Sequence, residues 1–306
     1  MSQYQRLLLI ADPSMRHYAA LQRAMALAEA SGAALHIAMF VEPLAVFDDN
    51  FQELPREGQL EERRRWLRQE TAALSAKGIQ VTLEVVWSNQ ALAEILLHVA
   101  QMQPDLLIKD VQRESALKRV FITPLDWHLL RECPVPVHLV SAAEHALPRK
   151  VLAAVDSASP QAQSCGLNER IIQVANDLAL QCDAELHLLH TYDLSASYVW
   201  DGAAGAAGAV PWSAELVDGL RNSLLLAFTT LADRYGVPAE RRHFVMGSAI
   251  NTIADFALQT QTDVLVMGTV QRHGLGKLLG STSEYVLYQA PCNILAVKPP
   301  EPPGLA

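Results

Sequence analysis

The chain has 306 residues, half of them hydrophobic and 19% charged, so it is long enough to bury a sizeable core in about two domains. Its formal net charge of -9 argues against a general nucleic-acid-binding protein, which would carry a basic face. No apolar run approaches the roughly 18 residues that a membrane-spanning helix needs, and four scattered cysteines form no metal-binding pattern, so we expect a cytoplasmic protein with no nucleic-acid, membrane or metal partner.

The elements expected along the first half of the chain recur in the same order along the second half. An apolar strand at Arg6–Ala11 ends in Asp12, and a similar strand at Lys150–Val155 ends in Asp156. Four such repeated blocks predict a duplicated domain, and the alternative is two unrelated domains. The other matched segments are Ser31–Pro43 with Gln181–Asp193, Glu84–Asp110 with His243–Thr269, and Leu130–Val140 with Leu287–Val297.

Both halves alternate short apolar runs with segments whose apolar residues have helical spacing. Runs such as Leu106–Ile108 are apolar throughout, which is typical of parallel strands covered by helices on both faces. The sequence therefore predicts an α/β fold with two tandem doubly wound domains, each with a parallel five-stranded sheet. We place the first domain at residues 1–142, a linker at 143–149 and the second domain at 150–300.

The segment Val266–Val286, VMGTVQRHGLGKLLGSTSEYV, predicts a buried strand, a glycine-rich loop and the start of a helix. Glycines such as Gly268 let backbone amides approach an anion, and the helix after Gly280 would turn its free N–H groups toward a phosphate. The same residues also fit a plain turn in which Ser281 is only the cap of the helix. Both interpretations, a nucleotide-binding loop and a simple turn, stay open from spacing alone.

This segment and the APCNILAVKP stretch that follows it resemble the C-terminal part of the universal stress proteins, many of which bind ATP through the pattern G-x2-G-x9-G-[ST]. The resemblance covers nearly the whole chain, and Phe121–Val140 is similar to the tandem-domain type found in bacteria. It implies a binding and signalling module of the stress response. It also implies that the two domains pair across their last strands, Val137–Val140 and Ile294–Val297, which would bury two strand edges.

Carried over residue by residue, the resemblance implies a site for ATP or another adenine nucleotide in the second half only; whether Mg²⁺ accompanies it is left open. The second glycine of the pattern falls on Gln271, and the loop is one residue shorter than the pattern. The implied cofactor-binding residues are Asp156 and Thr191 near the adenosine, Met267 and Gly268 before the loop, and Gly280, Ser281 and Thr282 beside the phosphates.

The first half lacks the features of a phosphate-binding loop. Asp110 stands where the second half has Gly268, and Thr123 and Pro124 stand where it has Gly280 and Ser281. We therefore expect no ATP in the first half, because Asp110 would repel phosphate and Pro124 has no amide to donate.

The chain contains no recognisable catalytic motif, so no catalytic residue is predicted. Two alternatives to the nucleotide-binding module remain: a scaffold that binds another ligand, and a weak ATPase. Protein partners and a homodimer are left open. The insertion Asp201–Trp212, rich in Gly and Ala, predicts a loop.

Overall fold

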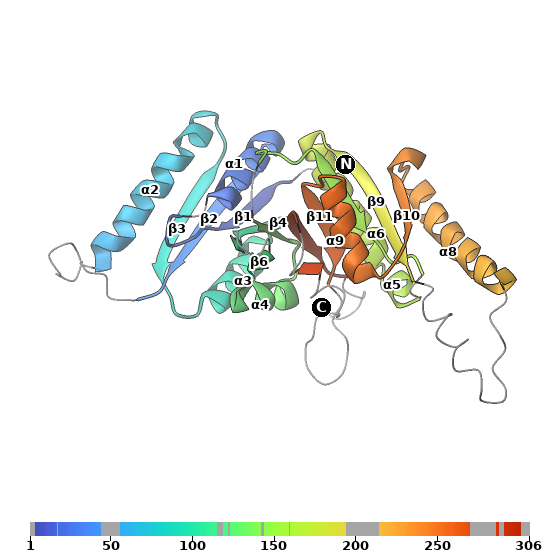
Figure 1. The fold of residues 1–306 in the computed structure, drawn as a ribbon. Coiled ribbons are helices and arrows are strands. Elements are labelled where there is room, and N and C mark those ends of the chain that lie inside the picture. The colour runs from blue at the N-terminus through green and yellow to red at the C-terminus, as the bar shows by residue number, and fades with distance from the viewer. Residues whose placement is uncertain are drawn as a thin grey trace, which may run out of the picture.

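The computed structural model describes residues 4–16, 18–43, 56–114, 119–121, 123–141, 144–158, 160–193, 214–269, 286–287 and 291–300. Within them, two five-stranded sheets join edge to edge into one ten-stranded sheet that carries helices on both faces (Figure 1). This confirms the predicted α/β class and the duplication. The predicted domain boundaries at residues 142 and 150 stay a prediction, and the Gly/Ala-rich insertion lies outside the described residues.

The first half has five parallel strands, which alternate with helices as the sequence predicts. Its strands are β1 (Arg6–Ile10), β2 (Ala34–Val41), β3 (Val81–Trp87), β4 (Leu106–Asp110) and β7 (Val137–Val140), in the spatial order β3-β2-β1-β4-β7. Its helices are α1 (Ala19–Ser31), α2 (Arg56–Ala76), α3 (Ala91–Met102) and α4 (Pro124–Glu132).

The second half repeats this arrangement. Its strands are β8 (Lys150–Ala154), β9 (Glu185–Tyr192), β10 (Arg242–Met246), β11 (Val264–Gly268) and β12 (Asn293–Val297), in the spatial order β10-β9-β8-β11-β12. Its helices are α5 (Pro160–Ser164), α6 (Leu167–Cys182), α8 (Ala214–Arg234), α9 (Ala249–Gln259) and the single 3₁₀ turn Ala239–Arg241. In each half the strand order reverses beside the first strand, between β1 and β4 and between β8 and β11.

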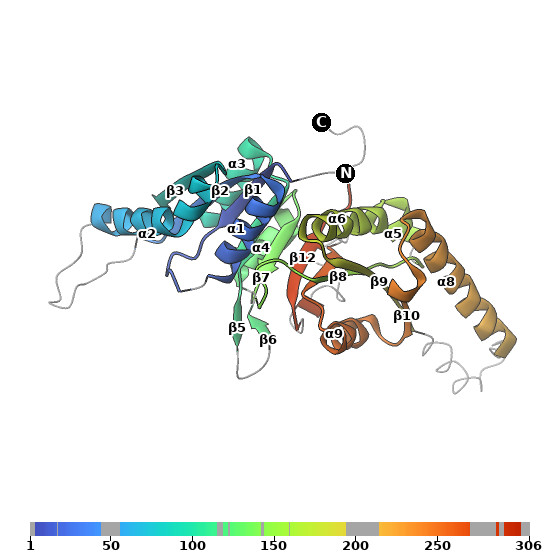
Figure 2. The ribbon, with the colours of Figure 1, turned by 90° about the horizontal axis from the view of Figure 1, so that it is seen from above.

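A short antiparallel hairpin follows β4 and was not predicted from the sequence. It consists of β5 (Gln112–Glu114) and β6 (Arg119–Phe121), and it projects from the body of the first half (Figure 2). Strands of three residues are too short to show the alternation of apolar and polar residues on which a strand prediction depends.

The core lies in two layers, one on each face of the common sheet. Buried residues of α1, α2, α6 and α8 pack with one face of the strands, and those of α3, α4 and α9 pack with the other. Each cluster contains residues from both halves, so the hydrophobic core is continuous across the junction. The long helices α2 and α8 lie at opposite ends of the molecule, beside the edge strands β3 and β10 (Figures 1 and 2). None of the described helices combines the length and the apolar character that crossing a membrane requires.

The junction between the halves is the antiparallel pair β7 and β12, which confirms the predicted pairing of the last strands. Leu139 lies opposite Ile294, and Val137 lies opposite Ala296. The buried His138 adds a hydrogen bond of 3.0 Å from its Nδ1 to the backbone oxygen of Ile294. Because β7 and β12 pair with each other, neither of these strand edges is exposed.

Candidate ligand sites at the carboxyl edge of the sheet

In the second half, the described residues with a predicted role all lie at the carboxyl edge of the sheet. Strand β8 runs between β9 and β11, so Asp156 after β8, Thr191 near the end of β9, and Met267 with Gly268 at the end of β11 share that edge. This is the place beside the reversal of strand order where ligands bind in open α/β sheets. The other predicted residues, Gly280, Ser281 and Thr282, lie outside the described residues, as does Gln271.

The turn that carries Asp156 is fixed by a buried side chain of α6. Asn168 accepts a hydrogen bond from the Asp156 backbone N–H at 3.0 Å and donates one to the Asp156 backbone oxygen at 2.8 Å. The carboxylate of Asp156 accepts from the N–H of Ala158 at 3.2 Å, and the first half has a matching bond of 3.0 Å from Ser14 N–H to Asp12. The Asp156 side chain is therefore held at the exposed end of β8 by a turn that both halves share.

His190, which the sequence places beside Thr191, has a structural role. Its ring is buried, its Nδ1 lies 3.1 Å from the backbone oxygen of Val155, and it stacks on Phe228 and Phe244. Burial is the main cause that lowers the pKa of His190, so the ring is neutral and its Nδ1–H donates to that oxygen. His190 thereby ties β9 to the end of β8 and fixes the position of the half-buried Thr191.

Gly268 lies in close contact with the helix α6. A Cβ atom at this position would lie 2.7 Å from Cδ2 of Leu167, which is closer than side-chain atoms approach in proteins. Leu167 is the first residue of α6, so the absence of a side chain at Gly268 lets that helix sit close to β11. The sequence did not predict this contact with α6, because it joins segments far apart in the chain.

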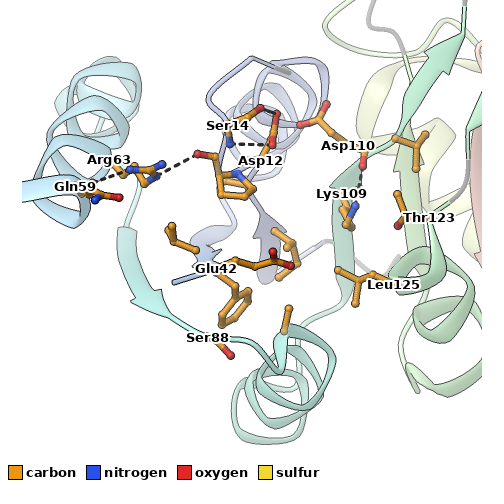
Figure 3. A pocket seen from close by; sticks show the side chains of 17 residues that line it. Asp12, Ser14, Glu42, Gln59, Arg63, Ser88, Lys109, Asp110, Thr123 and Leu125 are labelled. Atoms are coloured by element: carbon orange, nitrogen blue, oxygen red, sulfur yellow. Dashed lines mark hydrogen bonds between the residues drawn. The ribbon is translucent and has the colours of Figure 1, made fainter. Parts of the chain in front are cut away.

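At the corresponding edge of the first half, the described residues enclose a cavity of about 460 Å³ (Figure 3). This volume is within the usual range of about 300–1,000 Å³ for small-molecule sites. The sequence did not predict this cavity, because its walls come from six separate segments and carry no motif. Apolar side chains (Ile10, Phe40, Val41, Val111, Leu125) and ionisable ones (Asp12, Glu42, Arg63, Lys109, Asp110) both line it.

Two carboxylates occupy the helix N-termini next to this cavity. Asp110 is buried, and its Oδ1 accepts a hydrogen bond of 2.8 Å from the N–H of Ala20 in the first turn of α1. Asp126 is completely buried and forms a capping box with Thr123: Asp126 N–H donates to the Thr123 hydroxyl at 3.2 Å, and Thr123 N–H donates to the Asp126 carboxylate at 2.8 Å. Both helix ends thus already hold a negative charge, which would disfavour a phosphate at this edge.

The two cations of the cavity wall are held by neighbouring protein groups. Arg63 donates from Nε to the backbone oxygen of Pro13 at 3.1 Å and from Nη1 to that of Gln59 at 3.0 Å. Lys109 Nζ lies 2.8 Å from Oδ1 of Asp126. Since Asp12 and Glu42 also face the cavity (Figure 3), its charge favours a neutral or cationic ligand over an anionic one.

Comparisons with known proteins agree with this architecture. The sequence profile described as "Universal stress protein family" matches residues 3–141 and again 148–298. Universal stress protein E of Salmonella typhi is 29% identical over 310 residues, which cover 98% of this chain and 96% of that protein.

Two solved structures also share the fold over nearly their full length. A functionally unknown protein of Pseudomonas aeruginosa PAO1 superposes with a TM-score of 0.72 at 24% identity, covering 97% of this chain and 93% of its own. A universal stress protein of Archaeoglobus fulgidus DSM 4304 superposes with a TM-score of 0.66 at 16% identity, covering 98% of this chain and all of the other.

Proposed function

Because the chain belongs to the universal stress protein family, with one such domain in each half, we propose that it is a cytoplasmic stress-response module whose second half binds an adenine nucleotide. The observation that supports this proposal is the convergence of Asp156, Thr191, Met267 and Gly268 at the carboxyl edge beside the β8–β11 reversal. In this arrangement the Asp156 carboxylate accepts from ribose hydroxyls or the adenine amine, and Thr191 lies beside the base.

Binding is proposed for the second half only. In the first half, Asp110 and Asp126 occupy the helix N-termini that would otherwise donate to phosphate oxygens. Calorimetry with ATP is therefore expected to give one site per chain. Two sites of similar affinity, or nucleotide found beside Asp12, would contradict the proposed asymmetry.

Two substitutions in the loop test the proposed phosphate contact. Gly280→Val blocks close approach of the backbone, so it is expected to weaken ATP binding by more than about 1 kcal/mol, the usual contribution of one hydrogen bond. Gln271→Gly restores backbone freedom and is expected to leave affinity unchanged or to improve it. Both variants are titrated at one ionic strength, since salt screens phosphate contacts.

The outcome also separates the remaining alternatives. If Gly280→Val binds ATP as tightly as the parent chain, the loop does not hold phosphate and the nucleotide proposal fails. A phosphate-release assay on the same samples distinguishes a binding module from a weak ATPase, because a module releases no phosphate above the background rate.

The cavity of the first half supports a second function, which is binding of a small molecule without phosphate groups. Its apolar walls and the carboxylates of Asp12 and Glu42 suit a mainly apolar ligand that is neutral or positively charged. Since Leu125 lines the cavity, Leu125→Trp should reduce its volume, whereas Leu226→Trp changes an exposed position of α8 and serves as the control.

The neutral apolar dye Nile red is a suitable probe for this cavity. Leu125→Trp is expected to weaken dye binding by at least about tenfold, which corresponds to about 1.4 kcal/mol, and Leu226→Trp is expected to leave it unchanged. Equal effects of the two variants would show that the dye binds elsewhere, and the cavity would then lose this support.

A further inference from the structure

Three side chains that bind metals in other proteins converge on one face of the first half, away from the carboxyl edge. His36 comes from β2, Glu84 from β3 and His98 from α3, and their potential ligand atoms all lie within 4.8 Å of one another. The Nε2 atom of His98 is 3.0 Å from Oε2 of Glu84, and the Nε2 atom of His36 is 4.0 Å from the same oxygen. The two imidazole rings are stacked with their centroids 5.5 Å apart.

Both nitrogens of the His98 ring face oxygen atoms of the protein. Its Nδ1 lies 2.7 Å from the backbone oxygen of Glu94, which can only accept, so this nitrogen carries the proton. In the neutral ring, Nε2 would then turn its lone pair toward the Glu84 carboxylate, which is also an acceptor. A metal ion bound to both Nε2 and the Glu84 carboxylate would accept both electron pairs.

The position of the His36 ring also suits a metal ligand. Its Nδ1 is held 2.7 Å from the hydroxyl of Thr82, while its Nε2 is buried and has no hydrogen-bond partner among the described residues. Metal-binding histidines are commonly oriented in this way, with the second nitrogen hydrogen-bonded to a protein oxygen.

The second half provides an internal comparison, because the same positions there are filled by other residues. His187 corresponds to His36, and His243 corresponds to Glu84. Glu84 lies opposite Ala38, two residues after His36, and His243 lies opposite Leu189, two residues after His187. There the two imidazoles bond to each other directly, with His187 Nδ1 2.9 Å from His243 Nε2.

The helix position differs as well. A residue with positive φ follows each helix, Gln103 after α3 and Gln261 after α9. His98 lies five residues before Gln103, and Phe256 lies five residues before Gln261, so the two occupy the same helix position. The Phe256 ring packs on His243 with centroids 4.7 Å apart. The second half therefore fills this place with paired rings, whereas the first half has three groups that can each donate an electron pair.

We propose that His36, Glu84 and His98 bind one divalent transition-metal ion, for which zinc is the best match. Two imidazole nitrogens and one carboxylate oxygen form a common zinc donor set, usually with water in the fourth position. Zinc–ligand bonds of about 2.0–2.2 Å place tetrahedral donor atoms about 3.3 Å apart. The two histidine nitrogens lie 3.0 and 4.0 Å from the Glu84 oxygen, and all three atoms lie within 4.8 Å of one another, so side-chain shifts would bring them to these distances. The partly exposed Glu84 leaves an entry path, and the ion would fasten the edge strand β3 to α3.

The test uses the full chain after treatment with a chelator, titrated with Zn²⁺ by calorimetry and with Co²⁺ by visible absorption. We expect one ion per chain, a rise of the melting temperature with Zn²⁺, and a cobalt spectrum typical of four-coordinate nitrogen and oxygen ligands. Glu84→Gln and His98→Phe are each expected to weaken binding by at least about tenfold, as even outer residues of metal sites do. Phenylalanine is the residue that the second half already carries at this helix position.

His243→Gln is the matched control, since it changes the corresponding pair in the second half and leaves the proposed site intact. It is expected to bind zinc as the parent chain does. The proposal is overturned if the parent chain binds no zinc, if Glu84→Gln binds it equally well, or if His243→Gln abolishes binding. Circular dichroism in the presence of the chelator shows whether each variant is folded. If His98→Phe does not fold, the nearly isosteric Glu84→Gln decides the result.

Discussion

Replacing Asp126 by Ala is expected to lower the free energy of unfolding by about 3–5 kcal/mol, the usual cost of leaving one charge of a buried ion pair without its partner. Asp126 is completely buried, caps α4 together with Thr123, and lies 2.8 Å from Nζ of Lys109, whose side chain is only 15% exposed. Without the carboxylate, the largely buried ammonium of Lys109 keeps its hydrogen bond to the backbone oxygen of Asp110 but loses its opposite charge, and the first turn of α4 loses its cap. Denaturant unfolding of the parent chain and the variant measures the difference.

Two further variants separate the ion pair from the cap. Asp126→Asn keeps an oxygen that can accept from the N–H of Thr123, so it should lose the charge interaction and retain much of the cap. Lys109→Met combined with Asp126→Ala removes both charges, and the double variant should be more stable than Asp126→Ala alone. If Asp126→Ala changes the unfolding free energy by less than about 1 kcal/mol, which is the typical contribution of a helix cap, the buried pair does not stabilise the domain.

A second large effect is expected from acid, through His138 at the junction of the two halves. This ring is fully buried, and burial, followed by the nearby charge of Arg23, lowers its pKa from 6.5 to about 3. The unfolded chain therefore binds a proton at His138 as the pH falls below about 6.5, while the folded chain does not. The contribution of this group to the free energy of unfolding is fully present above pH 6.5 and is lost as the pH falls toward 3. The loss is about 1.4 kcal/mol per pH unit, which amounts to about 2 kcal/mol near pH 5.

The variant His138→Asn tests this expectation. Its amide can donate to the backbone oxygen of Ile294 in place of Nδ1 but does not titrate, so unfolding free energies of the variant should depend less on pH between 6.5 and 4. His128→Asn, at a half-exposed position of α4, is the control for losing a histidine outside the junction. Identical slopes for His138→Asn and the parent chain would show that another group is responsible for the loss of stability in acid.

The sequence predicted the fold because local and repeated patterns specify it. Apolar runs such as Leu106–Ile108 alternate with helical segments, and the same order appears twice, which was enough to predict two parallel sheets. The β7–β12 junction was implied by the resemblance to the universal stress proteins. The hairpin of β5 and β6 was missed because strands of three residues have no measurable period.

Much less of the candidate sites was predictable. The sequence predicted that Asp156 and Thr191 would share an edge of the sheet, and the strand order agrees. It did not predict the contact of Leu167 with Gly268, nor the grouping of His36 with Glu84 and His98. These contacts join residues from separate elements, and only the register of the strands and the rotation of the helices determine which side chains meet.

The pairing of β7 with β12 has a consequence for synthesis of the chain. β7 ends at Val140 and its partner β12 begins at Asn293, so the ribosome completes the first half long before its neighbouring strand exists. During that interval β7 is an open edge of a nearly finished sheet, and such edges pair readily with strands of other chains. If two chains with open β7 edges meet, each can later pair its β12 with the other chain's β7 and form an interlocked pair, which is a typical failure of multidomain folding. Rapid emergence of the second half, or a chaperone that covers β7, would therefore favour pairing of β7 with β12 of the same chain.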